Sequence, residues 1–150
     1  MKRNVVTAAM AGVIVVGLSG CANSFLAGPG TQTRQADNGL ELVFGPAFFD
    51  YKTAELGAEG QREVELIARL LRQKPGREVI IEGHTDDVGS EGYNFVLSMA
   101  RADAVKEALI EHGIEGDRLV VAAMGETLPA SFSNTEDGRA KNRRVEVIIR

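Results

Sequence analysis

Short runs of β-branched residues alternate with amphipathic helical stretches through most of the chain, and this alternation constrains the fold more than any other feature. Val64, Ile67, Ala68 and Leu71 recur at intervals of three and four residues, with charged and polar residues among them. This periodicity predicts a helix with one buried face, and Pro75-Gly76 is a typical helix end. The apolar face of such a helix must be covered by another layer of structure.

Four strands and a second long helix complete the predicted order of elements. The strands are expected at Leu40–Phe44, Val79–Glu82, Leu119–Met124 and Val145–Ile149, and the second helix at Tyr93–His112. Strands that alternate with helices favour an α/β (α+β) two-layer sandwich, with two long helices on a sheet of about four strands. The chain has 150 residues, which suits one folded domain, expected at residues 39–150.

The first twenty residues have the three-part layout of a secretory signal peptide. Two cations, Lys2 and Arg3, precede an uncharged apolar run from Val5 to Leu18, and small residues follow. The run is shorter than the roughly 20 residues that a membrane-spanning helix needs. The sequence therefore predicts a signal peptide at residues 1–20, with an uncleaved N-terminal anchor as the alternative.

A cysteine follows this segment, and Leu18-Ser19-Gly20-Cys21 resembles the lipobox of bacterial lipoproteins. The resemblance implies that Cys21 carries the lipid anchor, and the residue after it, Ala22 rather than an aspartate, implies an outer-membrane protein whose domain faces the periplasm. Several acyl chains, palmitate among them, would anchor firmly where one is marginal. A buried or reactive thiol fits less well, because no histidine is near in the sequence. Residues 21–38 are otherwise expected to form a flexible tether, with a reach of roughly 20–25 Å.

Composition excludes several classes of function. Without residues 1–20 the chain keeps 15 basic against 21 acidic residues, and so acidic a domain binds phosphate backbones poorly, so no nucleic-acid partner is expected. The sequence lacks zinc-ligand spacing and a glycine-rich phosphate loop, so neither a metal nor a cofactor is expected. Within this acidic domain Arg139, Lys141 and Arg144 are interpreted as charges that guard a strand edge.

An arginine on the apolar side of the second helix is the most informative conflict in the sequence. Asn94, Ser98 and Arg101 fall within the apolar sector of this helix, in its first turns only. A guanidinium there must be paired and hydrogen-bonded, or it costs on the order of several kcal/mol. Arg101 either finds an internal partner or water beyond the helix start, or it borders a polar pocket, where a helix N-terminus favours a carboxylate ligand.

The loop before this helix supplies the opposite charge. His84, Asp86 and Asp87 directly follow the strand at Val79–Glu82. Ligand sites of α/β sheets gather at the carboxyl ends of strands, where loops meet helix N-termini. Acids on one side and Arg101 on the other would form a bipolar site, which fits a zwitterion with one ammonium and one carboxylate group.

An ordered set of motifs is similar to the OmpA-like peptidoglycan-binding domain family, as found in Pal-like and OmpA-family lipoproteins. The motifs are Ile81-Glu82-Gly83-His84-Thr85-Asp86, Tyr93-Asn94, Leu97-Ser98 with Arg101-Ala102, Gly138-Arg139-Ala140 and Asn142-Arg143-Arg144-Val145-Glu146. The resemblance implies the order βαβαββ, a mixed sheet, and non-covalent binding of the meso-diaminopimelate of peptidoglycan, which would tether the outer membrane to the cell wall. It implies that Asp86 holds the ligand ammonium and Arg101 its carboxylate, while Asn94 and Arg143 shape or line the site. No catalytic residue is implied.

Two other functions stay open at this point. A metal-dependent periplasmic hydrolase would use His84, Asp86, Asp87 and His112, although His112 lies near the far end of the second helix and His84 alone is more typical of a loop histidine that hydrogen-bonds the backbone. An envelope-complex lipoprotein, a Tol-Pal-like scaffold, would bind other envelope proteins through a large exposed apolar patch.

Overall fold

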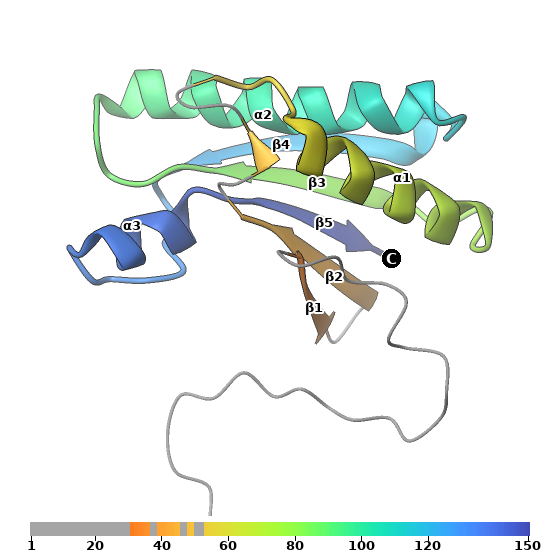
Figure 1. The fold of residues 1–150 in the computed structure, drawn as a ribbon, viewed down its shortest axis with the longest axis horizontal. Helices are drawn as coiled ribbons and strands as arrows, with labels where there is room; N and C mark the ends of the chain where they lie inside the picture. The colour runs from red at the N-terminus through yellow and green to blue at the C-terminus, as the bar shows by residue number, and fades with distance from the viewer. Residues whose placement is uncertain (1–30, 37–38, 46–47, 50–52) are drawn as a thin grey trace, which may run out of the picture.

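The computed structural model describes residues 31–36, 39–45, 48–49 and 53–150. The elements are β1 (Thr31–Ala36), β2 (Gly39–Phe44), α1 (Ala58–Arg72), β3 (Val79–His84), α2 (Glu91–Glu111), β4 (Leu119–Gly125), α3 (Glu136–Asn142) and β5 (Val145–Ile149), with a 3-10 turn at Gly116–Arg118. The two long helices, α1 and α2, lie side by side on one face of the sheet, and the short α3 lies at one end of it (Figure 1).

The strands form one mixed sheet in the order β1-β2-β5-β3-β4. β3 and β4 are parallel, and α2 is the crossover that connects them. β5 runs antiparallel to both of its neighbours, β2 and β3. The predicted two-layer α/β arrangement is confirmed, but the described sheet has five strands rather than four because β1 pairs antiparallel with β2.

β1 corrects part of the predicted tether. Residues 31–36 were expected to belong to it, yet they form an edge strand. An edge strand is held by backbone hydrogen bonds along one side, so it needs no apolar periodicity that the sequence would reveal. The predicted signal peptide at 1–20, Cys21 and the tether residues 22–30 lie outside the described residues. Within the described part of the chain, no helix is both long and apolar enough to span a membrane.

The basic residues near the C-terminus do not guard a strand edge, which is a second correction. Arg139 and Lys141 belong to α3, and β5 lies inside the sheet between β2 and β3. Arg144, directly before β5, is only 8% exposed, and its Nε donates to the Glu146 carboxylate. Its Nη2 donates to the carbonyl oxygen of Leu128 at 3.2 Å. Arg144 is thus a buried, paired cation.

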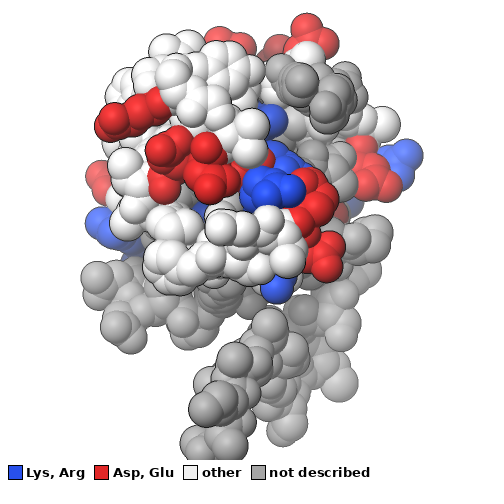
Figure 2. Space-filling view, turned by 90° about the vertical axis from the view of Figure 1, so that its left-hand side faces the viewer, with Lys and Arg blue, Asp and Glu red and all other residues white. Residues whose placement is uncertain are grey.

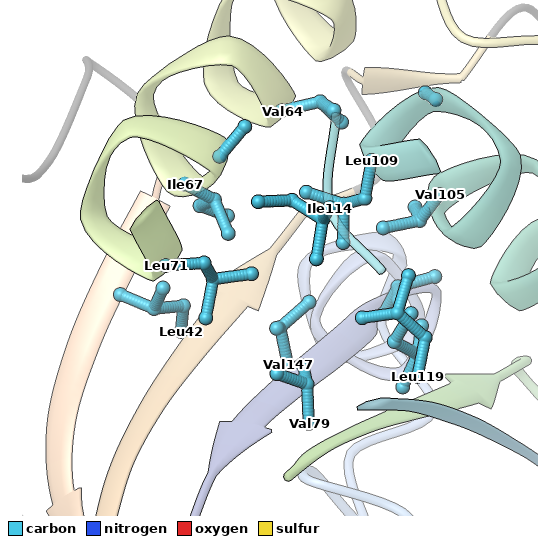
Figure 3. Packing of buried hydrophobic residues seen from close by; sticks show 14 of the residues in the cluster. Leu42, Val64, Ile67, Leu71, Val79, Val105, Leu109, Ile114, Leu119 and Val147 are labelled. Carbon is cyan, nitrogen blue, oxygen red and sulfur yellow. The ribbon is translucent and has the colours of Figure 1, made fainter. Parts of the chain in front are cut away.

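The core lies between the helices and the sheet, as Figure 3 shows. α1 buries the face that the sequence pattern predicts, and α2 is apolar on its core side beyond the first turns. The labelled members of this core are Leu42, Val64, Ile67, Leu71, Val79, Val105, Leu109, Ile114, Leu119 and Val147. Because both long helices and the strands β2, β3, β4 and β5 contribute buried side chains to this one cluster, the two helices are fixed relative to the sheet.

At the end of the sheet where β3 stops, α2 and β3 approach so closely that only glycine fits between them. A Cβ atom on Gly83 would lie 1.9 Å from the carbonyl oxygen of Ser98. The Ser98 hydroxyl also accepts a hydrogen bond from the backbone N–H of Gly125 at 3.0 Å. These contacts connect α2 to both β3 and β4 and set the position of the first turns of α2.

Candidate functional site

The four side chains that the sequence analysis predicts for the site come from three elements that meet at one end of the sheet. Asp86 follows β3, Asn94 and Arg101 lie on the first turns of α2, and Arg143 caps the C-terminus of α3. Figure 2 looks at this end of the molecule, where a small central patch of basic side chains is bordered by acidic side chains. The fold thus brings charges of both signs together at the carboxyl end of β3.

The Asp86 carboxylate is held on both of its oxygens. Oδ1 accepts the backbone N–H of Val88 at 3.1 Å, and Oδ2 accepts from Nη1 of Arg143 at 2.8 Å. The Asp86 side chain is 12% exposed, so this ion pair lies at the border of the interior. A short loop turn and a cation from α3 therefore fix the direction in which the carboxylate points.

Arg143 is held between two acids. Its Nη2 donates to Oε1 of Glu136, which lies in the first turn of α3, and its Nη1 donates to Asp86. Burial acts to lower the pKa of Arg143, but the hydrogen bonds to Asp86 and Glu136 outweigh it and raise that pKa. Arg143 therefore contacts the Asp86 carboxylate directly, whereas the resemblance implies only that it shapes or lines the site.

Arg101 is the buried cation of the site, with only 7% of its surface exposed. Its Nε donates to the carbonyl oxygen of Thr53 at 3.2 Å, and its Cζ lies 5.3 Å from the ring centroid of Phe49. No carboxylate of the described residues lies within 4.0 Å of its guanidinium. Burial and the Arg143 cation lower the pKa of Arg101, whereas the Asp86 carboxylate opposes this shift. The guanidinium of Arg101 is therefore close enough to Arg143 and Asp86 to be affected by the charge of each.

Asn94 orients the loop. Its side chain is fully buried, and its Nδ2 donates to the backbone carbonyl of Asp86 at 3.2 Å and to Oε2 of Glu126. The amide donor is therefore occupied by the protein, and Asn94 holds the Asp86 backbone in place. Glu126 and Glu136 were not predicted as site residues, because each is recognisable only through its side-chain partner, Asn94 or Arg143.

Two hollows adjoin this end of the molecule, and Glu126 lines both of them. The first is lined by Thr85, Asp87, Glu126, Pro129, Ser131, Phe132, Ser133, Asn134 and Asn142. The second is lined by Glu91, Gly92, Phe95, Met124, Gly125, Glu126 and Thr127. Asp86 and Arg101 line neither, but the chain neighbours of Asp86 line the first, which therefore borders the acidic side of the site.

The arrangement has the chemistry needed to bind a ligand that carries charges of both signs. Arg101 is a desolvated cation without a described anionic partner, and burying such a charge is costly until an anion pairs with it. The hydrolase constellation does not assemble, because His112 follows the C-terminus of α2. The 21 residues of that helix separate it from Asp86 by about 30 Å.

The ring of His84 departs from the expected loop histidine. His84 is the last residue of β3, and its backbone N–H donates to the carbonyl of Arg144 at 2.9 Å. Neither ring nitrogen has a hydrogen-bond partner in the described part of the chain. The expected bond from the ring to the backbone is therefore absent among the described residues.

Comparisons with known proteins agree with this architecture. Residues 48–143 match the family model described as the OmpA family. Outer membrane porin F of Pseudomonas aeruginosa is 38% identical over 102 residues, which are 67% of this chain and 29% of the porin. The peptidoglycan-associated lipoprotein of Legionella pneumophila is 38% identical over 100 residues, 67% of this chain and 57% of the lipoprotein.

Among solved structures, the cell wall anchor of the T6SS from Pseudomonas aeruginosa has a TM-score of 0.68 at 29% identity, over 78% of this chain and 85% of the anchor. The chain spans less than two thirds of the two relatives whose sequences are compared above. The match to the OmpA family supports the non-enzymatic interpretation of the sequence. The family match covers most of the folded domain, and the chain belongs to the OmpA family.

Proposed function

We propose that the chain binds peptidoglycan non-covalently, through the meso-diaminopimelate of the stem peptide. The observation that carries this proposal is the buried Arg101 guanidinium, which has no described carboxylate within ion-pair distance and lies in the electrostatic field of Asp86. The amino-acid end of diaminopimelate carries one carboxylate and one ammonium group, which match these two charges. Two relatives, named as a peptidoglycan-associated lipoprotein and a cell wall anchor, support peptidoglycan as the ligand.

Arg101 receives the ligand carboxylate in this proposal. Its Nε already donates to Thr53, and no described residue accepts a hydrogen bond from its two Nη nitrogens. A planar guanidinium binds a carboxylate through two parallel hydrogen bonds, which adds direction to the charge attraction. Each charge-assisted hydrogen bond contributes about 1.5–3 kcal/mol.

Asp86 receives the ligand ammonium group. Its Oδ2 is shared with Arg143, and Arg143 has a second acidic partner in Glu136. Asp86 can therefore exchange one contact with Arg143 for the ligand, while Arg143 keeps its charge paired with Glu136. Asn94 holds the Asp86 backbone during this exchange.

The membrane attachment of the chain is part of the same proposal. A lipid anchor on Cys21 would hold the domain at the periplasmic face of the outer membrane, and residues 22–30 would link the anchor to β1. The cell wall repeats its stem peptides many times, and a membrane holds many copies of the chain. Weak single sites then combine into firm attachment through avidity.

Sedimentation with purified sacculi tests this function. We expect Asp86→Ala and Arg101→Ala to abolish co-sedimentation, because each removes one of the two charged contacts. Asp103→Ala and Arg62→Ala are the matched controls, since both residues are exposed and lie away from the site. Circular dichroism confirms that each variant is folded. Undiminished co-sedimentation of both site variants would contradict the assignment.

The membrane attachment needs a separate measurement. Cys21→Ser should prevent acylation and move the chain from the membrane fraction to the soluble periplasmic fraction, while binding to sacculi persists. Incorporation of labelled palmitate into the wild-type chain, and its loss in Cys21→Ser, reports the modification directly. A chain that stays in the outer membrane after this substitution would contradict the lipid anchor.

Docking of another envelope protein is a second candidate function, and one observation favours it. Apolar side chains are exposed at the start of α2 and in the loop before it, with Val88 62%, Tyr93 53%, Phe95 50% and Val96 66% exposed. Exposed apolar groups of this size are typical of interaction surfaces. A photo-crosslinking residue at position 96 should then capture one envelope protein in cells, and Val96→Asp should prevent capture without affecting co-sedimentation with sacculi.

A further inference from the structure

Three chemistry-bearing side chains meet on the face of the sheet that is turned away from α1 and α2. Glu82 on β3 and Glu146 on β5 are direct cross-strand partners, and His84 lies two residues beyond Glu82. Nε2 of His84 is 3.9 Å from Oε2 of Glu82 and 3.9 Å from Oε2 of Glu146. One ligand atom from each of the three residues lies within 4.8 Å of the other two.

The two carboxylates of this cluster are not fully compensated. Like charges directly opposite one another on paired strands are destabilising. Arg144 neutralises one of them through its hydrogen bond to Oε1 of Glu146. Among the described residues no lysine or arginine lies within 4.0 Å of Glu82, whereas Arg144 binds Glu146. The cluster therefore has an excess of negative charge at its centre.

The His84 ring is buried and unpartnered. It is 1% exposed, and both ring nitrogens lack a hydrogen-bond partner in the described part of the chain. A buried imidazole whose Nε2 lies 3.9 Å from each of two carboxylates has the chemistry of a metal ligand.

We propose that Glu82, His84 and Glu146 bind a divalent transition-metal ion, and that Zn²⁺ is the ion best suited to them. Zinc accepts histidine nitrogen and carboxylate oxygen at about 2.0–2.2 Å, so three ligands around one ion lie roughly 3.3–3.7 Å apart. The two observed 3.9 Å distances reach this range with a small rotation of both glutamate side chains. The nitrogen ligand disfavours Ca²⁺ and Mg²⁺, which prefer oxygen ligands alone.

The surroundings of the cluster fit a structural metal ion. Arg144 holds Glu146 by its Oε1 and leaves Oε2 directed to His84, which is how an outer residue orients a ligating carboxylate. The ion would connect β3 to β5, directly beneath the loop that carries Asp86. The ion would stiffen this end of the sheet. The metal proposal does not depend on which ligand the site of Asp86 and Arg101 binds.

Equilibrium dialysis of the purified full-length chain against Zn²⁺, followed by metal analysis, tests the site. The chain is prepared without a histidine tag, because it contains only two histidines of its own. We expect one Zn²⁺ per chain at pH 7.5, and binding at least tenfold weaker in Glu82→Gln and His84→Gln. Cobalt substitution should give visible absorption bands of a low-coordinate nitrogen and oxygen site in the wild type only.

Two controls exclude other zinc ligands, and a second variant guards against loss of folding. His112→Gln and Cys21→Ser should bind Zn²⁺ as the wild type does. Glu82→Gln keeps the size and polarity of the side chain, so it tests the site even if His84→Gln does not fold. In urea unfolding, Zn²⁺ should raise the midpoint of the wild type but not of Glu82→Gln. Absence of stoichiometric binding, or equal binding in Glu82→Gln, would overturn the proposal.

Discussion

Substitution of Gly83 by alanine tests whether the contact between α2 and β3 sets the geometry of the site. The added Cβ would lie 1.9 Å from the carbonyl oxygen of Ser98 and 2.7 Å from its carbonyl carbon, and both atoms belong to the helix backbone. Because Cβ atoms in proteins essentially never approach other atoms within 3.0 Å, α2 must move by more than 1 Å. That movement also strains the hydrogen bond from Gly125 to Ser98.

The expected loss follows from these two effects. Overpacking of a close contact costs about 1–3 kcal/mol, and a disturbed buried hydrogen bond adds about 1 kcal/mol. We therefore expect Gly83→Ala to lower the free energy of unfolding by about 2–4 kcal/mol. Because α2 carries Arg101, the shift should also weaken co-sedimentation with sacculi, although position 83 itself contacts no ligand in the proposal.

Urea unfolding followed by circular dichroism measures the stability, and Gly92→Ala provides the matched control. Gly92 lies in the first turn of α2, where a Cβ would meet no atom within 4 Å. The same chemical change should there be neutral or stabilise the chain by up to about 1 kcal/mol, through helix propensity. A Gly83→Ala chain within about 0.5 kcal/mol of the wild type, the usual range of neutral surface substitutions, would refute the reasoning.

Two further predictions concern packing near the site and in the core. Ser98→Ala should lower the free energy of unfolding by about 1–3 kcal/mol, because it leaves the buried N–H of Gly125 without an acceptor. Urea unfolding measures this loss, and a variant as stable as the wild type would contradict the prediction. Leu109→Ala should cost about 2–5 kcal/mol in the same assay, since Leu109 is fully buried between the helices and the sheet; a loss below 1 kcal/mol would mean that the core repacks around the cavity.

The sequence was sufficient for the layers of the fold because those layers follow from periodicity. The apolar positions of α1 and the β-branched runs of β3 and β4 identify themselves locally. β1 could not be identified in this way, because only its backbone pairing with β2 shows that it is a strand. Arg144 was misassigned for a related reason: the position of β5 inside the sheet depends on partners far away in the chain.

The candidate site was predictable to the extent that single residues conflict with their local pattern. Arg101 on the apolar side of a helix is such a conflict, and the structure shows it as a buried cation. Asp86 and Arg143 are far apart in the sequence, so their direct pairing could not be predicted from local patterns. The sequence predicted only that both residues belong to the same site. The roles of Glu126 and Glu136 could not be predicted from the neighbouring sequence, because glutamates are common in surface loops and in the first turns of helices.

Isothermal titration calorimetry with two stem peptides tests the central claim most directly. One peptide contains meso-diaminopimelate, and the other contains lysine, which lacks only the side-chain carboxylate assigned to Arg101. We expect the wild type to prefer the diaminopimelate peptide by about tenfold or more, the equivalent of one charge-assisted contact, and Arg101→Met to bind both peptides equally. A folded Arg101→Met chain that keeps the wild-type preference would contradict the account.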